Sequence, residues 1–246
     1  MAARFTELLG HHVYGHSTQK TCLRSWSARF LVLQREGTDG EALLWDAWSA
    51  IAQLARMISY LEEGTQDRLI NFVQALSATP LLPEKDTLIH TQRVWTDLPL
   101  FGQCMRDLYY KNDDTSSWVN LNSWLARLTC VSNRPATDFA LYGLWAFRDA
   151  FEETSQVDEA TLRVACVWSL HCHDLFARYA KEGKTYPDRV AVPGPAFQAT
   201  KDWTGFTRER WSLWRQCLAL ALDRFSAAED AMFVQTRACV AQIDTM

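Results

Sequence analysis

The stretch from Trp118 to Glu152 reads WVNLNSWLARLTCVSNRPATDFALYGLWAFRDAFE, and it decides the fold class. Its first part places apolar residues at helical spacing on a single arc. A polar ridge borders this arc and consists of Asn120, Ser123 and Arg127. After a hinge at residues 133–135, the second part is apolar around nearly its whole circumference. Because a helix that is apolar on all sides is a buried one, the stretch predicts a central helical hairpin.

The rest of the chain carries the same helical periodicity. Further helices are predicted at residues 41–60, 66–76, 100–110, 157–181, 208–224 and 226–243. Suitable N-caps are Ser116 or Ser117, Thr137 and Thr207. No segment of useful length alternates as a strand does, so we predict an all-α, single-domain irregular bundle of about eight helices. Residues 1–40 are expected to be a partly irregular N-terminal extension, and residues 41–246 the helical domain.

One long connector interrupts this helical pattern. Residues 183–205 hold three prolines and three glycines, and they form the longest irregular stretch that the sequence predicts. Connectors longer than about 15 residues are commonly functional. The connector is therefore a candidate lid over a binding site.

The charge pattern argues against two classes of partner. The net charge is −4 and no block of Lys and Arg occurs, so neither nucleic acid nor an anionic membrane is an expected partner. No apolar run approaches the ~18 residues of a membrane span, and no apolar leader core is visible at the start. The seven cysteines are odd in number and lack a CxxC pair, which argues against a disulfide framework. We expect a cytoplasmic protein with reduced thiols.

Cofactor and metal signatures are missing from the sequence. There is no GxGxxG, GxxxxGK[ST], GxSxG or HExxH pattern, so no cofactor is predicted. His12 and His16 are four residues apart, but Gly10 and Gly15 argue against a helix there and a third ligand type is absent. The segment Asn112-Asp113-x-x-Ser116-x-x-x-Asn120 resembles part of the metal motif of class I terpene synthases. Because Asn120 replaces the terminal acid and no Asp-rich partner motif precedes it, we predict no metal site.

Four titratable residues fall near apolar helix faces. In the segment HCHD at 171–174, the helical wheel turns His173 inward and Asp174 outward. A buried histidine is either a general acid or base, or a core side chain with satisfied partners. Arg127, Glu152 and Arg210 are open to two interpretations as well: buried charges are usually paired, and Arg127 could reach Glu152 across the hinge, or they belong to a ligand site.

Several segments carry a family resemblance. They are Trp95-Thr-Asp-Leu-Pro99, Trp118-Val-Asn-Leu-Asn-Ser-Trp-Leu-Ala-Arg-Leu128, Ala150-Phe-Glu-Glu153, Val192-Pro-Gly-Pro-Ala196 and Gly205-Phe-Thr-Arg-Glu-Arg-Trp-Ser-Leu-Trp214. From about Glu41 onward the chain resembles an uncharacterised fungal family, the domain of unknown function numbered thirty-six thirty-two, which more often has Phe where this chain has Trp124. The resemblance implies a soluble, helical, fungal protein and supplies no activity.

The aromatic content suggests small-molecule chemistry. Eleven Trp, twelve Phe and seven Tyr exceed what a plain helical core requires, and aromatic side chains also line ligand pockets. We expect a cofactor-independent enzyme of fungal specialised metabolism, a cyclase or isomerase that rearranges a bulky apolar small molecule in an aromatic pocket. The alternatives are a non-catalytic helical interaction or ligand-binding protein and, more distantly, a metal-dependent terpene cyclase. The candidate catalytic residues are Arg127, His173, Arg210 and Glu152. The candidate substrate-binding residues are Asn120, Asn122, Trp118, Trp145, Trp211 and Trp214.

Overall fold

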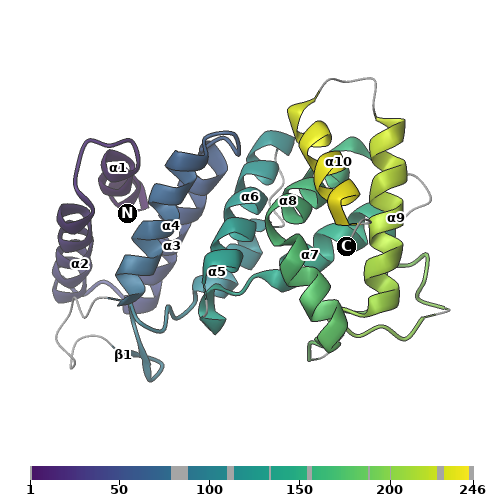
Figure 1. Cartoon of the computed structure of the whole chain (residues 1–246). Coiled ribbons are helices and arrows are strands. Elements are labelled where there is room, and N and C mark those ends of the chain that lie inside the picture. Colours follow the sequence, from purple (N-terminus) through teal and green to yellow (C-terminus); the bar gives the residue numbers. More distant parts are fainter. Residues whose placement is uncertain are drawn as a thin grey trace. The chain divides into compact units, whose positions relative to one another are not determined.

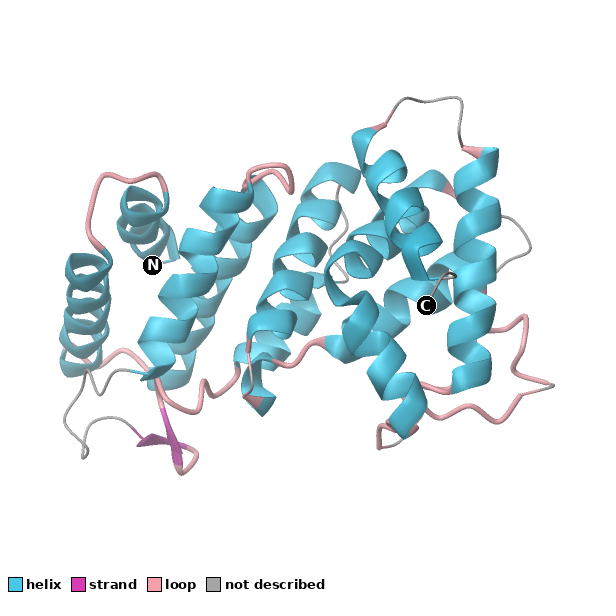
Figure 2. Cartoon of the chain, viewed as in Figure 1, coloured by secondary structure: helices cyan, strands magenta, loops and turns pink. Residues whose placement is uncertain are grey.

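Helices dominate the computed structural model, and the all-α prediction is confirmed (Figures 1 and 2). The structure describes residues 2–78, 88–109, 114–132, 134–153, 157–187, 189–199, 201–225 and 230–243. Within these ranges there are ten α-helices rather than about eight: α1 Ala2–Val13, α2 Gln19–Arg35, α3 Gly40–Met57, α4 Glu63–Ala78, α5 Phe101–Tyr109, α6 Thr115–Val131, α7 Ala140–Phe151, α8 Glu159–Glu182, α9 Arg208–Arg224 and α10 Ala231–Ile243. A two-stranded antiparallel hairpin, β1 Leu88–Ile89 and β2 Gln92–Arg93, and a short 3-10 helix, Pro135–Thr137, complete the described elements.

The two additional helices lie in the first 40 residues, which were expected to be partly irregular. Thr18 caps α2 by accepting a hydrogen bond from the backbone N–H of Thr21. Phe5 and Leu9 of α1 are fully buried, and α1 packs against α2, α3 and α4. Phe5 and Leu9 therefore belong to the core, and two helices make up most of the N-terminal extension.

The chain divides into two compact units, of which unit 1 comprises Met1–Trp124 and Arg134–Thr137. Aromatic residues fill its interior: the ring of Trp26 lies 4.7 Å from that of Phe5 and 5.2 Å from that of Phe72, measured between centroids. The buried indole N–H of Trp48 donates to the carbonyl oxygen of Pro99 at 2.7 Å. Much of the tryptophan excess is thus packed core.

Unit 2 comprises Leu125–Asn133 and Asp138–Met246, and α8 packs against α7, α9 and α10 within it. Nine of the twelve residues of α7 are buried, as its all-round apolar sequence predicts. Phe147 of α7 lies at 5.9 Å from Phe176 of α8 and at 5.2 Å from Trp214 of α9, between ring centroids. None of the helices in the described ranges combines the length and the hydropathy that a membrane span requires.

Of the three predicted N-caps, one is confirmed and two are wrong. Thr207 caps α9 as predicted, because its hydroxyl accepts a hydrogen bond from the N–H of Arg210 at 3.1 Å. The prediction for α6 was wrong, since its first turn is capped by the carboxylate of Asp114 rather than by a serine. The prediction for Thr137 was also wrong: the chain first makes a 3-10 turn there, and α7 begins three residues later. The hinge residue Asn133 and the motif residues Asn112 and Asp113 lie outside the described residues.

Candidate functional site

Glu152 and Arg210 form a buried ion pair in unit 2. Glu152 follows the last residue of α7, and Arg210 lies in the first turn of α9, where the Thr207 cap fixes the backbone. Both side chains are fully buried, and the contact is bidentate: Arg210 Nε donates to Oε1 of Glu152 at 2.8 Å and Nη2 donates to Oε2 at 3.0 Å. Glu152 therefore pairs with Arg210, and the predicted pairing of Glu152 with Arg127 is wrong.

Two further N–H groups donate hydrogen bonds to the carboxylate of Glu152. The indole N–H of Trp214 donates to Oε1 at 2.7 Å, and the backbone N–H of Gly194 in the connector donates to Oε2 at 2.8 Å. A side chain at position 194 would not fit, because a Cβ atom there would lie 2.6 Å from the carbonyl oxygen of Glu152. The glycine thus allows the connector backbone to reach the carboxylate.

The guanidinium of Arg210 also has a hydrogen-bond acceptor for each of its N–H groups. Besides its two bonds to Glu152, it donates to the carbonyl oxygens of Ala191 at 2.8 Å, Gly205 at 3.0 Å and Val192 at 3.3 Å. These contacts use the five N–H donors that a guanidinium offers. Burial lowers the pKa of Arg210, and the neighbouring carboxylate of Glu152 opposes that shift. The pair is a closed polar cluster that ties the connector to α7 and α9.

Asn120 and Asn122, two of the predicted substrate-binding residues, lie in the part of α6 that belongs to unit 1, and their side chains bond to the backbone. Asn120 is 9% exposed, accepts from the N–H of Tyr60 at 2.9 Å and donates to the carbonyl oxygen of Arg56 at 3.0 Å. Asn122 is fully buried and donates to the carbonyl oxygen of Trp118 at 3.0 Å. Asn120 therefore anchors the turn between α3 and α4.

Ser123 extends this hydrogen-bond network within unit 1, whereas Arg127 belongs to unit 2. Ser123 is fully buried and its hydroxyl donates to the side-chain oxygen of Gln66 at 3.2 Å. The amide of Gln66 in turn reaches the carbonyl oxygen of Asn120 at 3.4 Å. Arg127 is half-buried and lies in the part of α6 that belongs to unit 2.

His173 is the candidate residue whose surroundings differ most from ordinary core packing. It is 6% exposed, and both of its ring nitrogens lack a hydrogen-bond partner among the described residues. The imidazole lies 4.9 Å from the ring of Trp211, between centroids. Burial lowers the pKa of His173, the charge of Arg215 lowers it further, and Asp174 opposes the shift. The histidine is therefore neutral at pH 7.

Of the candidate tryptophans, Trp118 is buried in unit 1 with its ring 6.3 Å from that of Tyr109, between centroids, and the other three lie in unit 2. Trp145 is buried and its indole N–H donates to the carbonyl oxygen of Val190 at 2.7 Å. Trp214 belongs to the Glu152–Arg210 cluster, and Trp211 contacts His173. The structure thus brings together Glu152, Arg210 and Trp214 in one cluster and His173 with Trp211 in another.

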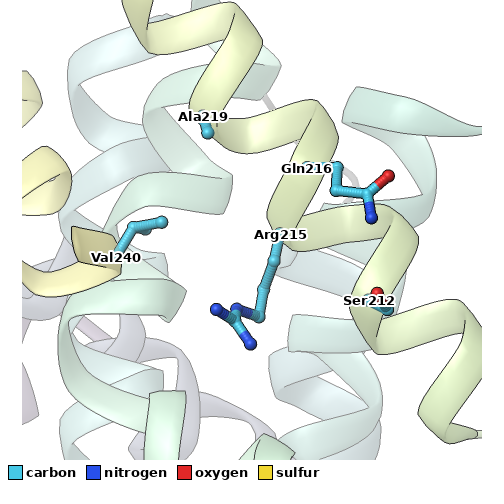
Figure 3. A pocket seen from close by; sticks show the side chains of 5 residues that line it. All are labelled: Ser212, Arg215, Gln216, Ala219 and Val240. Atoms are coloured by element: carbon cyan, nitrogen blue, oxygen red, sulfur yellow. The ribbon is translucent and has the colours of Figure 1, made fainter. Parts of the chain in front are cut away.

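A cavity beside α9 lies among residues that the sequence did not single out. It has a volume of about 190 Å³, and Figure 3 shows the side chains that line it. They are Ser212, Arg215, Gln216 and Ala219 of α9 and Val240 of α10. The four α9 residues share one helix face because they are spaced i, i+3, i+4 and i+7. That spacing was visible in the sequence, but only the packing of α10 beside α9 makes it a cavity.

The arrangement favours anion binding over metal binding. Arg215 supplies a guanidinium to the cavity, with a hydroxyl and an amide from Ser212 and Gln216 on the same face. A guanidinium is a preferred partner of carboxylates because its fork of N–H groups matches their two oxygens. In the described part of the chain, no group of three or more His, Cys, Asp or Glu side chains is placed to hold a metal ion.

Comparison with known proteins gives a family. Neither the curated proteins nor the solved structures yield a match to this chain. The family described as "Protein of unknown function (DUF3632)" matches residues 48–218, which is more than half of the 246 residues. This range includes the second half of α3, all of α4 to α8 and most of α9, and so both Glu152 and Arg210. The chain therefore belongs to the DUF3632 family.

Proposed function

We propose that this chain is a helical ligand-binding protein whose site is the cavity between α9 and α10, and that its ligand is a small molecule carrying a carboxylate. The observation that supports the proposal most is the guanidinium of Arg215 at the cavity, beside polar groups of Ser212 and Gln216 and the apolar side chain of Val240. Such a mixture suits a ligand with an anionic end and an apolar body.

Two observations favour binding over the expected rearrangement chemistry at Glu152 and Arg210. The hydrogen-bonding groups of this pair are used within the protein, so a substrate would have to displace connector backbone to reach them. The cavity of about 190 Å³ is also smaller than the ~300 Å³ typical of pockets for drug-sized ligands, which argues for a compact ligand. The proposed ligand is accordingly smaller and more polar than the sequence suggested.

Arg215→Gln tests the proposed site with benzoate as the probe. Loss of a charged hydrogen-bonding partner typically weakens an interaction by about 1.5–3 kcal/mol, so benzoate affinity should fall roughly ten-fold or more. Isothermal titration calorimetry on the full chain measures the dissociation constant. Arg208→Gln is the matched control, because it removes the same charge from an exposed position of the same helix and should leave affinity unchanged.

The uncharged analogue benzamide provides a second control, since it keeps the ring and removes the carboxylate. We expect the wild-type chain to bind benzoate and to bind benzamide far more weakly. The proposal is wrong if neither compound binds at millimolar concentration, or if Arg215→Gln binds benzoate as the wild type does.

The second candidate function is a cofactor-independent cyclase or isomerase of fungal specialised metabolism, acting in the cytoplasm. His173 is the observation that favours it. A neutral imidazole is a competent general base at pH 7, both ring nitrogens of His173 lack a hydrogen-bond partner among the described residues, and the charge of Arg215 lowers the pKa of His173. In this version Arg215 would stabilise an enolate-like anion while His173 moves a proton. Conversion of a ligand found by the binding experiment, followed by mass spectrometry or NMR, would distinguish the two functions.

The pH dependence of stability tests the environment of His173. Because its pKa is lowered in the folded chain, the unfolded chain binds this proton first as the pH falls below about 6.5. The contribution of His173 to folding stability is therefore intact above that pH and is lost as the pH falls toward the folded pKa. His173→Gln should flatten the decline in the free energy of unfolding between pH 7.5 and pH 5.5, measured by urea titration at each pH.

The exposed His16 supplies the control for this experiment, and His16→Gln should leave the wild-type slope unchanged. Comparing slopes is necessary because other groups titrate in the same window. Burial, for example, raises the pKa of Asp149 to about 6. A His173→Gln slope equal to that of the wild type would contradict the assigned environment.

A further inference from the structure

Two cysteines that are far apart in the sequence meet in unit 2. Cys130 lies in the last turn of α6 and Cys172 lies within α8. Their Sγ atoms are 2.8 Å apart, about 0.8 Å more than the ~2.05 Å of a disulfide bond. The Sγ of Cys130 also donates to the carbonyl oxygen of His171 at 3.0 Å, and the Sγ of Cys172 to that of Ala126 at 3.2 Å. Each thiol is thus held in place by the backbone of the other helix.

The two thiols differ in accessibility. All seven cysteines fall within the described residues, and Cys130 is the exposed one, whereas Cys172 is buried. Hydrogen bonding from Cys172 lowers the pKa of Cys130, while burial raises the pKa of Cys172 well above the ordinary value. Cys130 is therefore open to an oxidant from solvent and loses its proton more readily than Cys172, which is shielded from solvent but touches Cys130.

The backbone at Cys172 departs from the helix. Its φ of −116° and ψ of 15° interrupt α8, which is otherwise helical from Glu159 to Glu182. The thiol of Cys130 bonds to the carbonyl oxygen of the preceding residue, His171, in the same place. A side chain that inserts into the hydrogen-bond ladder is a known cause of helix kinks. The short approach that a disulfide requires would therefore occur where α8 is already irregular.

We propose that Cys130 and Cys172 are a redox-active pair that forms a reversible disulfide, with Cys130 as the attacking thiol and Cys172 as the resolving thiol. With a peroxide as oxidant, the Cys130 thiolate attacks one peroxide oxygen, the O–O bond breaks, and hydroxide leaves as water after protonation. The sulfur of Cys172 then attacks the sulfenic acid of Cys130, and a second water leaves as the S–S bond forms. Two thiols lose two electrons and two protons, and hydrogen peroxide is reduced to two waters. A dithiol reverses the step by exchange.

The pair fits a regulatory disulfide better than a permanent one. It would join the end of α6 to the interrupted part of α8 and close the chain between residues 130 and 172. One member is exposed and both are present as free thiols, as expected for a labile pair. The odd number and scatter of the cysteines gave no sign of this pairing in the sequence, because it depends on how α6 and α8 pack.

The test uses the full chain, stoichiometric hydrogen peroxide and alkylation with N-ethylmaleimide under denaturing conditions. Intact-mass analysis should show two fewer than the seven adducts of the reduced chain, with all seven restored by dithiothreitol. Tryptic digestion should then link peptide 128–148 to peptide 164–178. Because the second peptide also contains Cys166, fragmentation must place the link at Cys172.

Two variants complete the experiment. Cys130→Ser changes an exposed position and should abolish the disulfide, so that its six remaining thiols are all alkylated. Cys217→Ser, at a half-buried cysteine, should still lose two adducts on oxidation. A linkage through Cys166, a dimer joined through Cys130, or a stable sulfinic acid at Cys130 with Cys172 unmodified would each overturn the proposal, as would an unchanged seven-adduct mass.

Discussion

Arg210→Ala is expected to lower the free energy of unfolding by about 3–5 kcal/mol, because it leaves the carboxylate of Glu152 buried without its cation. Both side chains are fully buried, so the carboxylate left behind lies away from bulk water. Urea titration followed by far-UV circular dichroism and tryptophan fluorescence measures the loss. Arg208→Ala is the matched control, since Arg208 is exposed two residues earlier in α9, and it should change stability by no more than about 0.5 kcal/mol.

A double variant that removes both charges tests whether stability depends on the pairing of Glu152 with Arg210 rather than on either residue alone. Buried ion pairs replaced together by apolar residues are often neutral or stabilising, so Glu152→Leu combined with Arg210→Met should recover part of the loss. The recovery should be incomplete here, because the double variant leaves the N–H groups of Trp214 and Gly194 and the carbonyl oxygens of the connector without partners. A single Arg210→Ala variant as stable as the wild type would contradict the structural role of the pair.

Gly143→Ala should destabilise unit 2 by about 1–3 kcal/mol, as overpacking of a filled core does. A Cβ atom at position 143 of α7 would lie 2.3 Å from Cζ of Phe176 and 2.8 Å from Cε3 of Trp168, both in α8. Because two large rings about two turns apart on α8 make these contacts, the two helices would have to separate. The measurement is the same urea titration.

Gly10→Ala is the control for this substitution and should act with the opposite sign. Gly10 lies in α1, and no atom would come within 4 Å of the added Cβ. Alanine is favoured over glycine inside a helix by up to about 1 kcal/mol, so the variant should be as stable as the wild type or more stable. Equal effects of the two substitutions would show that α7 and α8 do not pack as closely as described.

Local sequence signals predicted the helices well. The Thr207 cap and the apolar spacing of Trp211, Trp214 and Leu218 placed α9 at residues 208–224, as found. The inward position of His173 and the outward one of Asp174 also followed from the helical wheel. Such features depend on neighbours within one or two turns, which the sequence displays directly.

Contacts between residues far apart in the sequence could not be predicted from these local signals. Glu152 and Arg210 are 58 positions apart, and the helical wheel alone could not say which arginine reaches the carboxylate. The role of Gly194 depends on the contact of its backbone with Glu152, and the cavity at Arg215 depends on the packing of α10 beside α9. Neither contact is visible in the sequence. Pairings of this kind are set by the packing of whole helices, which the spacing of residues along one helix does not determine.

We propose that the Glu152–Arg210 cluster stabilises the fold and that Arg215 binds the ligand. Benzoate affinity, measured in two variants, tests this proposal most directly. The Glu152→Leu/Arg210→Met double variant, once shown to be folded, should bind benzoate within about three-fold of the wild type, because its changes lie outside the residues that line the cavity. Arg215→Gln should bind it roughly ten-fold more weakly or worse. The opposite pattern, with benzoate binding lost in the folded double variant and kept in Arg215→Gln, would place the ligand chemistry at the buried pair and contradict the account.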